Sequence, residues 1–418
     1  MIYRCSRKEI ENFICALAGI LSMNPYFLWP SFFHGLLNYI AYIIYFLSAV
    51  IMIKKGAKLR SKNLISTCLL IFIYLFTYLH SFKKSSILSI LGGGFLFLYL
   101  VTFTWLDREN QKEIFRSFTK LFVISLIPGL IYYVLECLGI SLSIGTLYSE
   151  NQLRYANSVE SLLTQSSGYY KLYIGAVLRI NANTRFSGIY DEAGLIGTVG
   201  ALCLIGNKMD LKRDIWSRWI FLFVILSFSL AGYILLLIYI LLDSVKKKQW
   251  KIPLILLTLT FAFFIILNLS SNNPLIINFQ NRFRITESGI SLINNRETSN
   301  FNIGYSQLKN GTILEKMFGF GRGASTENIY MNGSSSVRSM IFNYGYFGFS
   351  IIILEIIYLY RGYFKRIWSR NWSEFVLLIL FLISIYQRPS IYYPYYFVIL
   401  YGGAANLAYK QITEREMK

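Results

Sequence analysis

Residues 185–197 read Arg-Phe-Ser-Gly-Ile-Tyr-Asp-Glu-Ala-Gly-Leu-Ile-Gly, and they stand where a long apolar segment begins. The stretch combines one arginine (Arg185), two adjacent carboxylates (Asp191 and Glu192) and three glycines. Charge is costly inside a lipid bilayer, so ionisable groups at the head of an apolar segment tend to mark function. This stretch is therefore the place from which to trace the topology and the place to look for chemistry.

The composition around this stretch is typical of a membrane protein. Of the 418 residues, 55% are hydrophobic and only 15% are charged, whereas a soluble domain carries roughly 25% charged residues. Apolar segments near the ~20 residues needed to cross a bilayer recur along the whole chain. We therefore predict an all-α, polytopic integral membrane protein with about 10–12 transmembrane helices.

The net charge of +20 comes from lysines and arginines that lie mostly in short connections between apolar segments. This distribution follows the positive-inside rule, and without a soluble basic domain it excludes nucleic acid as a partner. The five cysteines are scattered without paired spacing, and both histidines, His34 and His80, lie near apolar segments. A disulfide framework, a zinc site and a Ser-His-Asp triad are not indicated, so we expect no metal and no cofactor.

Hydropathy and charge together predict the spans and their direction. Basic clusters after the second and fourth spans are assigned to the cytoplasm, which also puts the N-terminus there. The predicted spans lie near 9–23, 31–53, 63–80, 86–106, 121–140, 186–206, 252–269, 341–360, 374–387 and 391–409. They divide the chain into N-terminal helices (1–140), a first outer loop (141–184), motif-bearing helices (185–269), a second outer loop (270–340) and C-terminal helices (341–418).

One apolar run, 219–242, conflicts with a simple crossing because basic clusters flank it on both sides. A single crossing would put one cluster outside, while about 24 residues are too few for two full spans of ~20 residues. The run is interrupted at 229–232 (Ser-Leu-Ala-Gly), which predicts a broken pair of short segments, either a re-entrant hairpin or a tilted pair. The alternative is one ordinary span with an imperfect charge bias.

The two outer loops of this topology collect arginines. Guanidinium groups suit bidentate recognition of phosphate or carboxylate, whereas topology alone needs only positive charge. An anionic substrate is therefore favoured over solvated loop charge that merely pairs with nearby glutamates. The basic residues on this face are Arg154, Lys171, Arg179, Arg185, Arg282, Arg284, Arg296, Arg322 and Arg338.

Two short patterns define candidate groups. Residues 319–323 (Gly-Phe-Gly-Arg-Gly) could bring backbone N–H groups close to a phosphate, although short glycine runs are often plain turns. Arg185 and Glu192 are separated by nearly two helical turns, so both could share one helix face unless the helix begins only at Gly188. Asp191 and Glu192 could act as a general base or position a hydroxyl, and Glu192 could equally pair with an arginine.

These residues resemble the O-antigen polymerase/ligase superfamily, which includes bacterial O-antigen and capsule repeat-unit polymerases. That family carries an R-x-x-G-x-x-x-E-P-type motif, which Arg185, Gly188 and Glu192 match and from which Ala193 departs. Residues 228–232 resemble its T-x-S-R-G-like break, and the arginines of the second loop precede 319–321 and a G-x-x-G at 345–348. The resemblance extends over residues 180–409, while the N-terminal half matches in hydropathy only.

One departure separates the two activities within the superfamily. The ligases carry H-[N/S/Q]-x9-G-x-x-G in the second loop, and counting back from Gly345 gives Ser334-Ser335 at that place. Because serine is no base near neutral pH, this departure favours a polymerase over a ligase.

The resemblance implies an enzyme of the bacterial cytoplasmic membrane, a metal-independent glycosyltransferase that acts on the outer face. Its substrates would be undecaprenyl-diphosphate-linked oligosaccharide repeat units, which it would polymerise into capsule, O-antigen or exopolysaccharide. Implied partners are the lipid bilayer, a flippase and a chain-length regulator protein. The alternatives are a ligase-like glycan transferase and a flippase for lipid-linked sugars, although a transporter would want ionisable residues along its spans and repeated halves.

For this reaction we predict catalytic roles for Arg185, Asp191, Glu192 and Arg296. The arginines would neutralise the charge of the leaving diphosphate, and a carboxylate would orient the acceptor hydroxyl. The predicted substrate-binding residues are Arg282, Arg284, Arg322, Arg338, Gly188 and Gly321.

Overall fold

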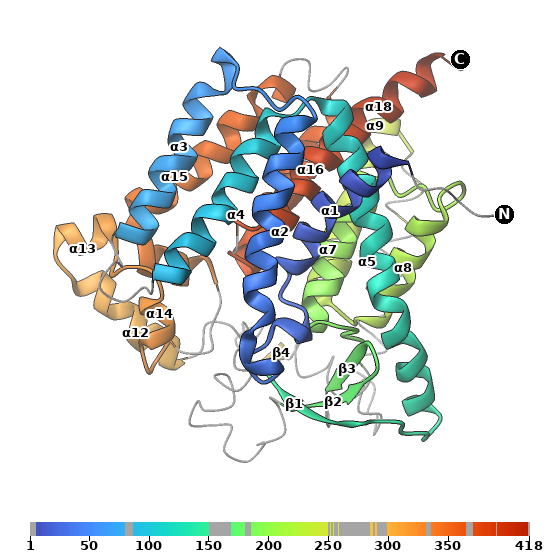
Figure 1. Cartoon of the computed structure of the whole chain (residues 1–418), viewed down its shortest axis with the longest axis horizontal. Coiled ribbons are helices and arrows are strands. Elements are labelled where there is room, and N and C mark those ends of the chain that lie inside the picture. The colour runs from blue at the N-terminus through green and yellow to red at the C-terminus, as the bar shows by residue number, and fades with distance from the viewer. Residues whose placement is uncertain are drawn as a thin grey trace.

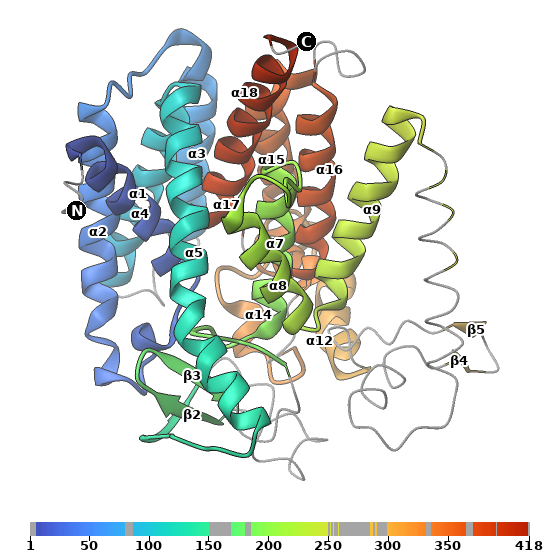
Figure 2. The same ribbon diagram turned by 90° about the vertical axis from the view of Figure 1, so that its right-hand side faces the viewer.

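The computed structural model of the chain describes residues 6–79, 87–149, 169–179, 185–249, 251, 254, 258, 285–286, 289–290, 299–331, 336–364, 371–389 and 391–416. The described chain is mostly helical, with long helices packed side by side and two small sheets (Figures 1 and 2). One end of this bundle carries the larger sheet, and the C-terminus lies at the other. We call these the sheet end and the C-terminal end.

The described residues up to 149 contain five α-helices. Ser6 and Glu9 form a capping box that starts the first, and the Asp107 carboxylate caps the fifth by accepting a hydrogen bond from Asn110 N at 2.8 Å. The helices are α1 (Arg7–Leu21), α2 (Leu37–Lys54), α3 (Ser61–Leu79), α4 (Ile87–Trp105) and α5 (Arg108–Cys137), with 3₁₀ turns at Tyr26–Leu28 and Phe33–Gly35.

The other described helices follow α5 in the chain. Helix α7 is the central one, because all of its residues are buried and it contacts α8, α9, α16 and α18. The helices are α7 (Ala193–Gly206), α8 (Ile215–Leu226), α9 (Leu230–Lys247), α12 (Ser299–Asn310), α13 (Ile313–Phe318), α14 (Ala324–Glu327), α15 (Val337–Phe364), α16 (Trp372–Gln387), α17 (Pro394–Phe397), the π-turn Val398–Gly402 and α18 (Gly403–Glu416).

Four described helices are long and apolar enough to cross a membrane, by length and composition. They are Leu37–Lys54, Ile87–Trp105, Arg108–Cys137 and Val337–Arg361. Shorter apolar helices are Asn63–Tyr78, Ala193–Gly206, Ile215–Leu226 and Trp372–Tyr386. The described residues thus contain fewer clear spans than the about 10–12 expected from hydropathy. The predicted span 252–269 lies outside the described residues apart from two positions.

The apolar run after α7 is not one straight helix. It divides at 227–229 into α8 and α9, and the break overlaps the predicted 229–232 at Ser229, which caps α9 by accepting from Gly232 N. Helix α9 returns toward the end of the bundle where α8 starts (Figure 2). A Cβ on Gly197 of α7 would clash with Ser229, so the break lies pressed against α7.

The expectation of an all-α chain is wrong for the segment 141–184. It contains a three-stranded antiparallel sheet of β1 (Gly145–Tyr148), β2 (Tyr169–Tyr173) and β3 (Ala176–Arg179). Aromatic residues favour strands, and a two-residue turn at 174–175 joins the paired Tyr173 and Ala176. A second antiparallel pair, β4 (Ile285–Thr286) and β5 (Gly289–Ile290), lies in the segment 270–340.

Distant segments close the bundle at α1. Tyr99 on α4 donates its hydroxyl to the carbonyl of Cys15 at 3.0 Å. The backbone N–H of Tyr395, at the start of α17, donates to Ser22 Oγ at 3.1 Å. The first helix therefore packs against one of the last.

Candidate functional site

The opening stretch lies at the sheet end, where it leads into α7. The helix begins only at Ala193, and Glu192 is its N-terminal capping residue in extended conformation. Arg185 and Glu192 therefore do not share a helix face, which corrects that part of the sequence interpretation. Their side chains reach different elements, and each ties the stretch to a different part of the bundle.

Arg185 holds the break between α8 and α9. Its Nε donates to the carbonyl oxygen of Ser227 at 3.1 Å, and the next residue, Phe186, donates its backbone N–H to Leu226 O at 3.0 Å. The two carbonyls belong to the last turn of α8, which leaves its final carbonyls without intrahelical partners. The charged motif and the broken pair, two separate sequence patterns, are thus parts of one structural unit.

Glu192 forms an ion pair with Arg388, a residue that the sequence interpretation missed. Its Oε2 lies 2.6 Å from Arg388 Nη2, and the side chains are 33% and 12% exposed. Gly194 leaves room for the pair, because a Cβ there would lie 3.0 Å from Arg388 Nη2. The available signal was topological, since Arg388 occupies a short connection that the predicted topology places outside, against the positive-inside trend.

Asp191 is held by the sheet. Tyr170, from β2, donates its hydroxyl to the Asp191 carbonyl, and Ser149 Oγ lies 3.5 Å from Asp191 Oδ2. Burial raises the pKa of Tyr170, and the neighbouring Asp191 charge raises it further, so the phenol stays a proton donor. The sheet itself is anchored to α5, where Lys171 Nζ lies 2.8 Å from Glu136 Oε2.

Gly188 is packed against α5. Its φ is +58°, its carbonyl accepts from Val177 N at 3.0 Å, and a side chain there would collide with Leu126. This geometry shows a packing role for Gly188, and its part in substrate binding stays a prediction.

The glycine-rich loop 319–323 carries Arg322 and fixes its backbone position. Its three glycines have φ of +74°, +99° and +82°, which only glycine adopts readily. The N–H groups of Phe320 and Gly321 donate to Phe342 O at 3.0 Å and Asn343 O at 2.8 Å. These two N–H groups are thus used within the protein, and a part for Gly321 in substrate binding stays a prediction.

Arg322 lies in a cluster of tyrosines. Its Cζ is 4.4 Å from the ring centroid of Tyr78, a cation–π contact, and it interacts electrostatically with Tyr42 and Tyr344. The glycine run of α4 admits two of these rings, because side chains at Gly92 and Gly93 would occupy the places of Tyr42 and Tyr78. High aromatic content was evident in the sequence, but the register that brings these rings together was not.

A tyrosine-rich segment connects the two arginine sites. Tyr393 lies near Tyr42, Tyr78 and Tyr344 of the Arg322 cluster. Its ring lies 6.1 Å from that of Tyr395, which in turn interacts with Arg388. The segment 392–396 thus places tyrosines between Arg322 and the Glu192–Arg388 pair, with Tyr393 exposed and Tyr395 and Tyr396 buried.

The other predicted arginines have separate positions. Arg338 donates from Nη1 to Asn302 Oδ1 at 3.2 Å and lies over the Tyr305 ring, so it joins α15 to α12. Arg282, Arg284 and Arg296 lie outside the described residues, as do Ser334 and Ser335.

No protein-family model, no curated protein and no solved structure matches this chain. The resemblance to the O-antigen polymerase/ligase superfamily therefore rests on the residues quoted above, and function is a matter of what the site can do. At the sheet end the described residues offer three guanidinium groups (Arg185, Arg322 and Arg388), two carboxylates (Asp191 and Glu192) and a cluster of mostly buried tyrosines.

Proposed function

We propose that this chain is a polytopic enzyme of the bacterial cytoplasmic membrane that polymerises undecaprenyl-diphosphate-linked oligosaccharide repeat units. The observation that carries the proposal is the Glu192–Arg388 ion pair at the head of the buried helix α7. A carboxylate and a guanidinium in contact, partly shielded from water, suit a reaction in which a hydroxyl attacks and a diphosphate leaves. With the motif of Arg185, Gly188 and Glu192, this pair supports polymerisation better than simple transport.

In the proposed reaction, the acceptor hydroxyl of one lipid-linked unit attacks C1 of the glycan on another. A C1–O glycosidic bond forms as the C1–O bond to the diphosphate breaks, and undecaprenyl diphosphate leaves with the bonding electron pair. The acceptor proton passes to a carboxylate, Glu192 or Asp191, or to the departing diphosphate. Guanidinium groups neutralise the charge that develops on the diphosphate.

The roles follow from position. Arg388 holds Glu192 and is the buried guanidinium nearest to it. Arg322, on its glycine loop over Tyr78, receives the second phosphate or a sugar beside its tyrosine cluster. Arg185 keeps the α8–α9 break in place, and Arg296, with Arg282 or Arg284, completes the diphosphate site in the proposal. Tyr393, the exposed tyrosine of the segment 392–396, offers its ring face to sugar units.

The proposal is tested by a ladder assay. Purified protein in liposomes is given lipid-linked repeat units, and products are separated by length; we expect the wild-type chain to produce a ladder. We expect Arg322→Ala to reduce product longer than two units at least about tenfold, since one charge-assisted contact contributes roughly 1.5–3 kcal/mol. Arg7→Ala, at an exposed position paired with Glu11, is the control and should leave the ladder unchanged.

The outcomes separate the alternatives. Movement of lipid-linked units across the vesicle without any ladder would assign a flippase, and transfer to a different acceptor without chain growth would assign a ligase-like transferase. A wild-type ladder with normal chain length in both Arg322→Ala and Arg185→Ala would contradict the site while keeping the activity.

The orientation is tested by cysteine labelling. Single cysteines are introduced at Tyr330, Arg213 and Leu230 after replacement of the five native cysteines. A membrane-impermeant maleimide should label position 330 in intact cells and position 213 only after permeabilisation, because basic connections stay inside. Position 230, beside the α8–α9 break, should be shielded in both. Labelling of position 330 only from the cytoplasm would overturn the orientation.

A further inference from the structure

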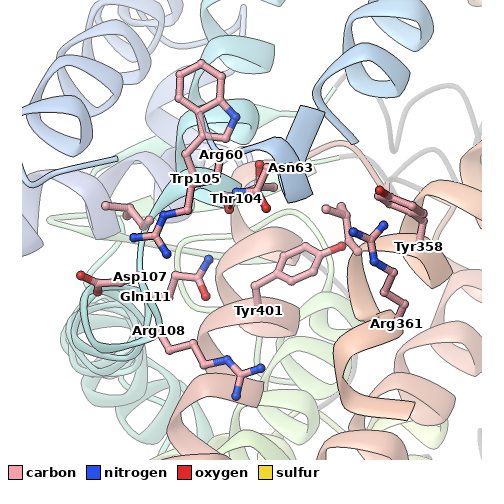
Figure 3. Close-up of a pocket in the computed structure, with 12 residues that line it drawn as sticks. Arg60, Asn63, Thr104, Trp105, Asp107, Arg108, Gln111, Tyr358, Arg361 and Tyr401 are labelled. Carbon is pink, nitrogen blue, oxygen red and sulfur yellow. Dashed lines mark hydrogen bonds between the residues drawn. The ribbon is translucent and has the colours of Figure 1, made fainter. Parts of the chain in front are cut away.

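A second basic site lies at the C-terminal end, in a pocket between α3, α4, α5 and α15 (Figure 3). Its volume is about 430 Å³, within the roughly 300–1,000 Å³ of typical small-molecule sites. Arg60 lines it just before α3 begins, whereas Tyr78 in the last turn of α3 carries Arg322. At ~1.5 Å per residue the two arginine sites are about 27 Å apart along the helix, so this pocket is separate from the candidate site.

The pocket carries an excess of positive charge. Three guanidinium groups line it, those of Arg60, Arg108 and Arg361, against one carboxylate, that of Asp107. That carboxylate is engaged as the cap of α5, where Asn110 donates to it from N at 2.8 Å and from Nδ2 at 3.2 Å. The capping bonds direct its oxygens to the helix terminus, so the lining favours an anion.

The polar walls are held in place by bonds within the protein. Asn63 Nδ2 donates to Thr104 O at 3.2 Å, and Gln111 Nε2 donates to Phe103 O at 3.0 Å. The Arg361 guanidinium stacks on the Tyr358 ring, with Cζ 3.7 Å from the centroid. A planar guanidinium can stack on a ring face and also donate hydrogen bonds in its own plane.

The guanidinium groups come from different elements. Figure 3 shows Arg60 and Arg361 on opposite sides of Tyr401, with Arg108 below. Guanidinium groups placed around the pocket from several elements suit a group with oxygens pointing in several directions, as in a phosphate, better than a planar carboxylate.

The surface beside the pocket is apolar. On and just before α3, Leu59, Leu64 and Ile65 are 49%, 49% and 54% exposed, and they flank the lining residues Arg60 and Asn63. A ligand with an anionic head and an apolar tail would satisfy both surfaces, with its head among the guanidinium groups and its chains along α3. Basic pockets between membrane helices bind lipid headgroups in this way.

We propose that this pocket binds the phosphate-bearing headgroup of an anionic membrane lipid. The site is distinct from the polymerisation site at the sheet end, and the proposal does not depend on the proposed function. It gives the chain a specific requirement for anionic lipid at the end that its basic connections would place in the cytoplasm.

The test measures lipid retention directly. Delipidated protein is titrated with phosphatidylglycerol in detergent and bound molecules are counted by native mass spectrometry. We expect a saturable site in the wild type and at least about tenfold weaker binding in Arg60→Gln/Arg361→Gln, because two charge-assisted contacts are lost. Arg213→Gln, exposed at the same end and not lining the pocket, is the control and should bind as the wild type does.

Two further arms identify the source of the phosphate. Phosphatidylcholine has the phosphate without the net negative charge and should bind at least about tenfold more weakly, since the pocket favours net anions. Inorganic diphosphate has the charge without the chains, and binding of it in place of phosphatidylglycerol would overturn the lipid assignment. Equal phosphatidylglycerol binding in the double variant and the wild type would overturn the site itself. Arg361→Lys, which keeps the charge and removes the stacked fork, should bind between the two and covers the case in which the double variant fails to fold.

Discussion

Glu192→Gln should abolish long polymer, with at least about a 100-fold loss of chain-extension rate in the ladder assay, because general acid–base groups contribute roughly 10²–10⁴-fold. The substitution keeps the size of the side chain and removes the charge that faces Arg388 at 2.6 Å. Arg388→Ala should have the same effect on polymer. It should also destabilise the protein by about 1–3 kcal/mol, between the values for exposed and fully buried pairs, because Glu192 is about one-third exposed.

The charge-exchanged double variant Glu192→Arg/Arg388→Glu separates a chemical role from a structural one. It preserves an ion pair, so the melting temperature should return toward the wild-type value, while polymerisation should stay absent because the carboxylate and guanidinium have changed places. Recovery of polymer in the exchanged variant would show that the ion pair has only a structural role. Asp210→Asn is the matched control, because it breaks the 3.4 Å pair with Lys410 at the opposite end and should leave polymer length unchanged.

Among the glycine-to-alanine substitutions at described positions, Gly345→Ala should be the most destabilising. Gly345 interrupts α15 with φ +68° and ψ 178°, and a Cβ there would overlap the backbone of Met317 and lie 2.5 Å from Phe318 N. Backbone strain of roughly 1–3 kcal/mol and overpacking of roughly 1–3 kcal/mol together predict a loss of about 2–6 kcal/mol. Thermal unfolding in detergent measures the change.

The damage should reach the candidate site, because the carbonyls just before Gly345 hold the glycine loop. Asn343 O accepts from Gly321 N, and Asn343 Oδ1 accepts from Ser325 N, each at 2.8 Å. Gly345→Ala should therefore also weaken polymerisation through displacement of Arg322. Gly145→Ala is the control, since it meets no atom within 4 Å. An unchanged melting temperature in Gly345→Ala would contradict the predicted close approach.

Local patterns predicted the features that depend on local chemistry. The break between α8 and α9 follows from Ser229 and Gly232 inside an apolar run with basic residues on both sides, and the structure divides the run there. The interruption of α15 at Gly345 falls within the G-x-x-G of the resemblance, although no break was predicted there. In each case a glycine or a capping side chain changes the backbone within a few positions. The neighbouring residues in the sequence are therefore enough to locate such a feature.

Features that depend on long-range packing were not predictable in the same way. The partner of Glu192 is Arg388, which comes from the far end of the chain, and only the assembled bundle brings them together. The strands β2 and β3 are short and rich in apolar side chains, so hydropathy alone could not separate them from a membrane-interface segment. Likewise Tyr78 meets Arg322 because α3 ends beside the glycine loop, a relation of registers that no motif encodes.

The contact between Tyr395 and Ser22 can form only late in the synthesis of the chain. The two residues are 373 positions apart, and a ribosome adding roughly 5–20 residues per second needs about 20–75 s to cover that distance. Helix α1 leaves the ribosome first, yet its packing partner α17 is made near the end of translation. For most of synthesis, part of the surface that α1 buries in the finished structure has no packing partner. A chain that ends before Tyr395 would leave that surface of α1 without its partner. The packing of the first helix is therefore completed only when the C-terminal segment has been made.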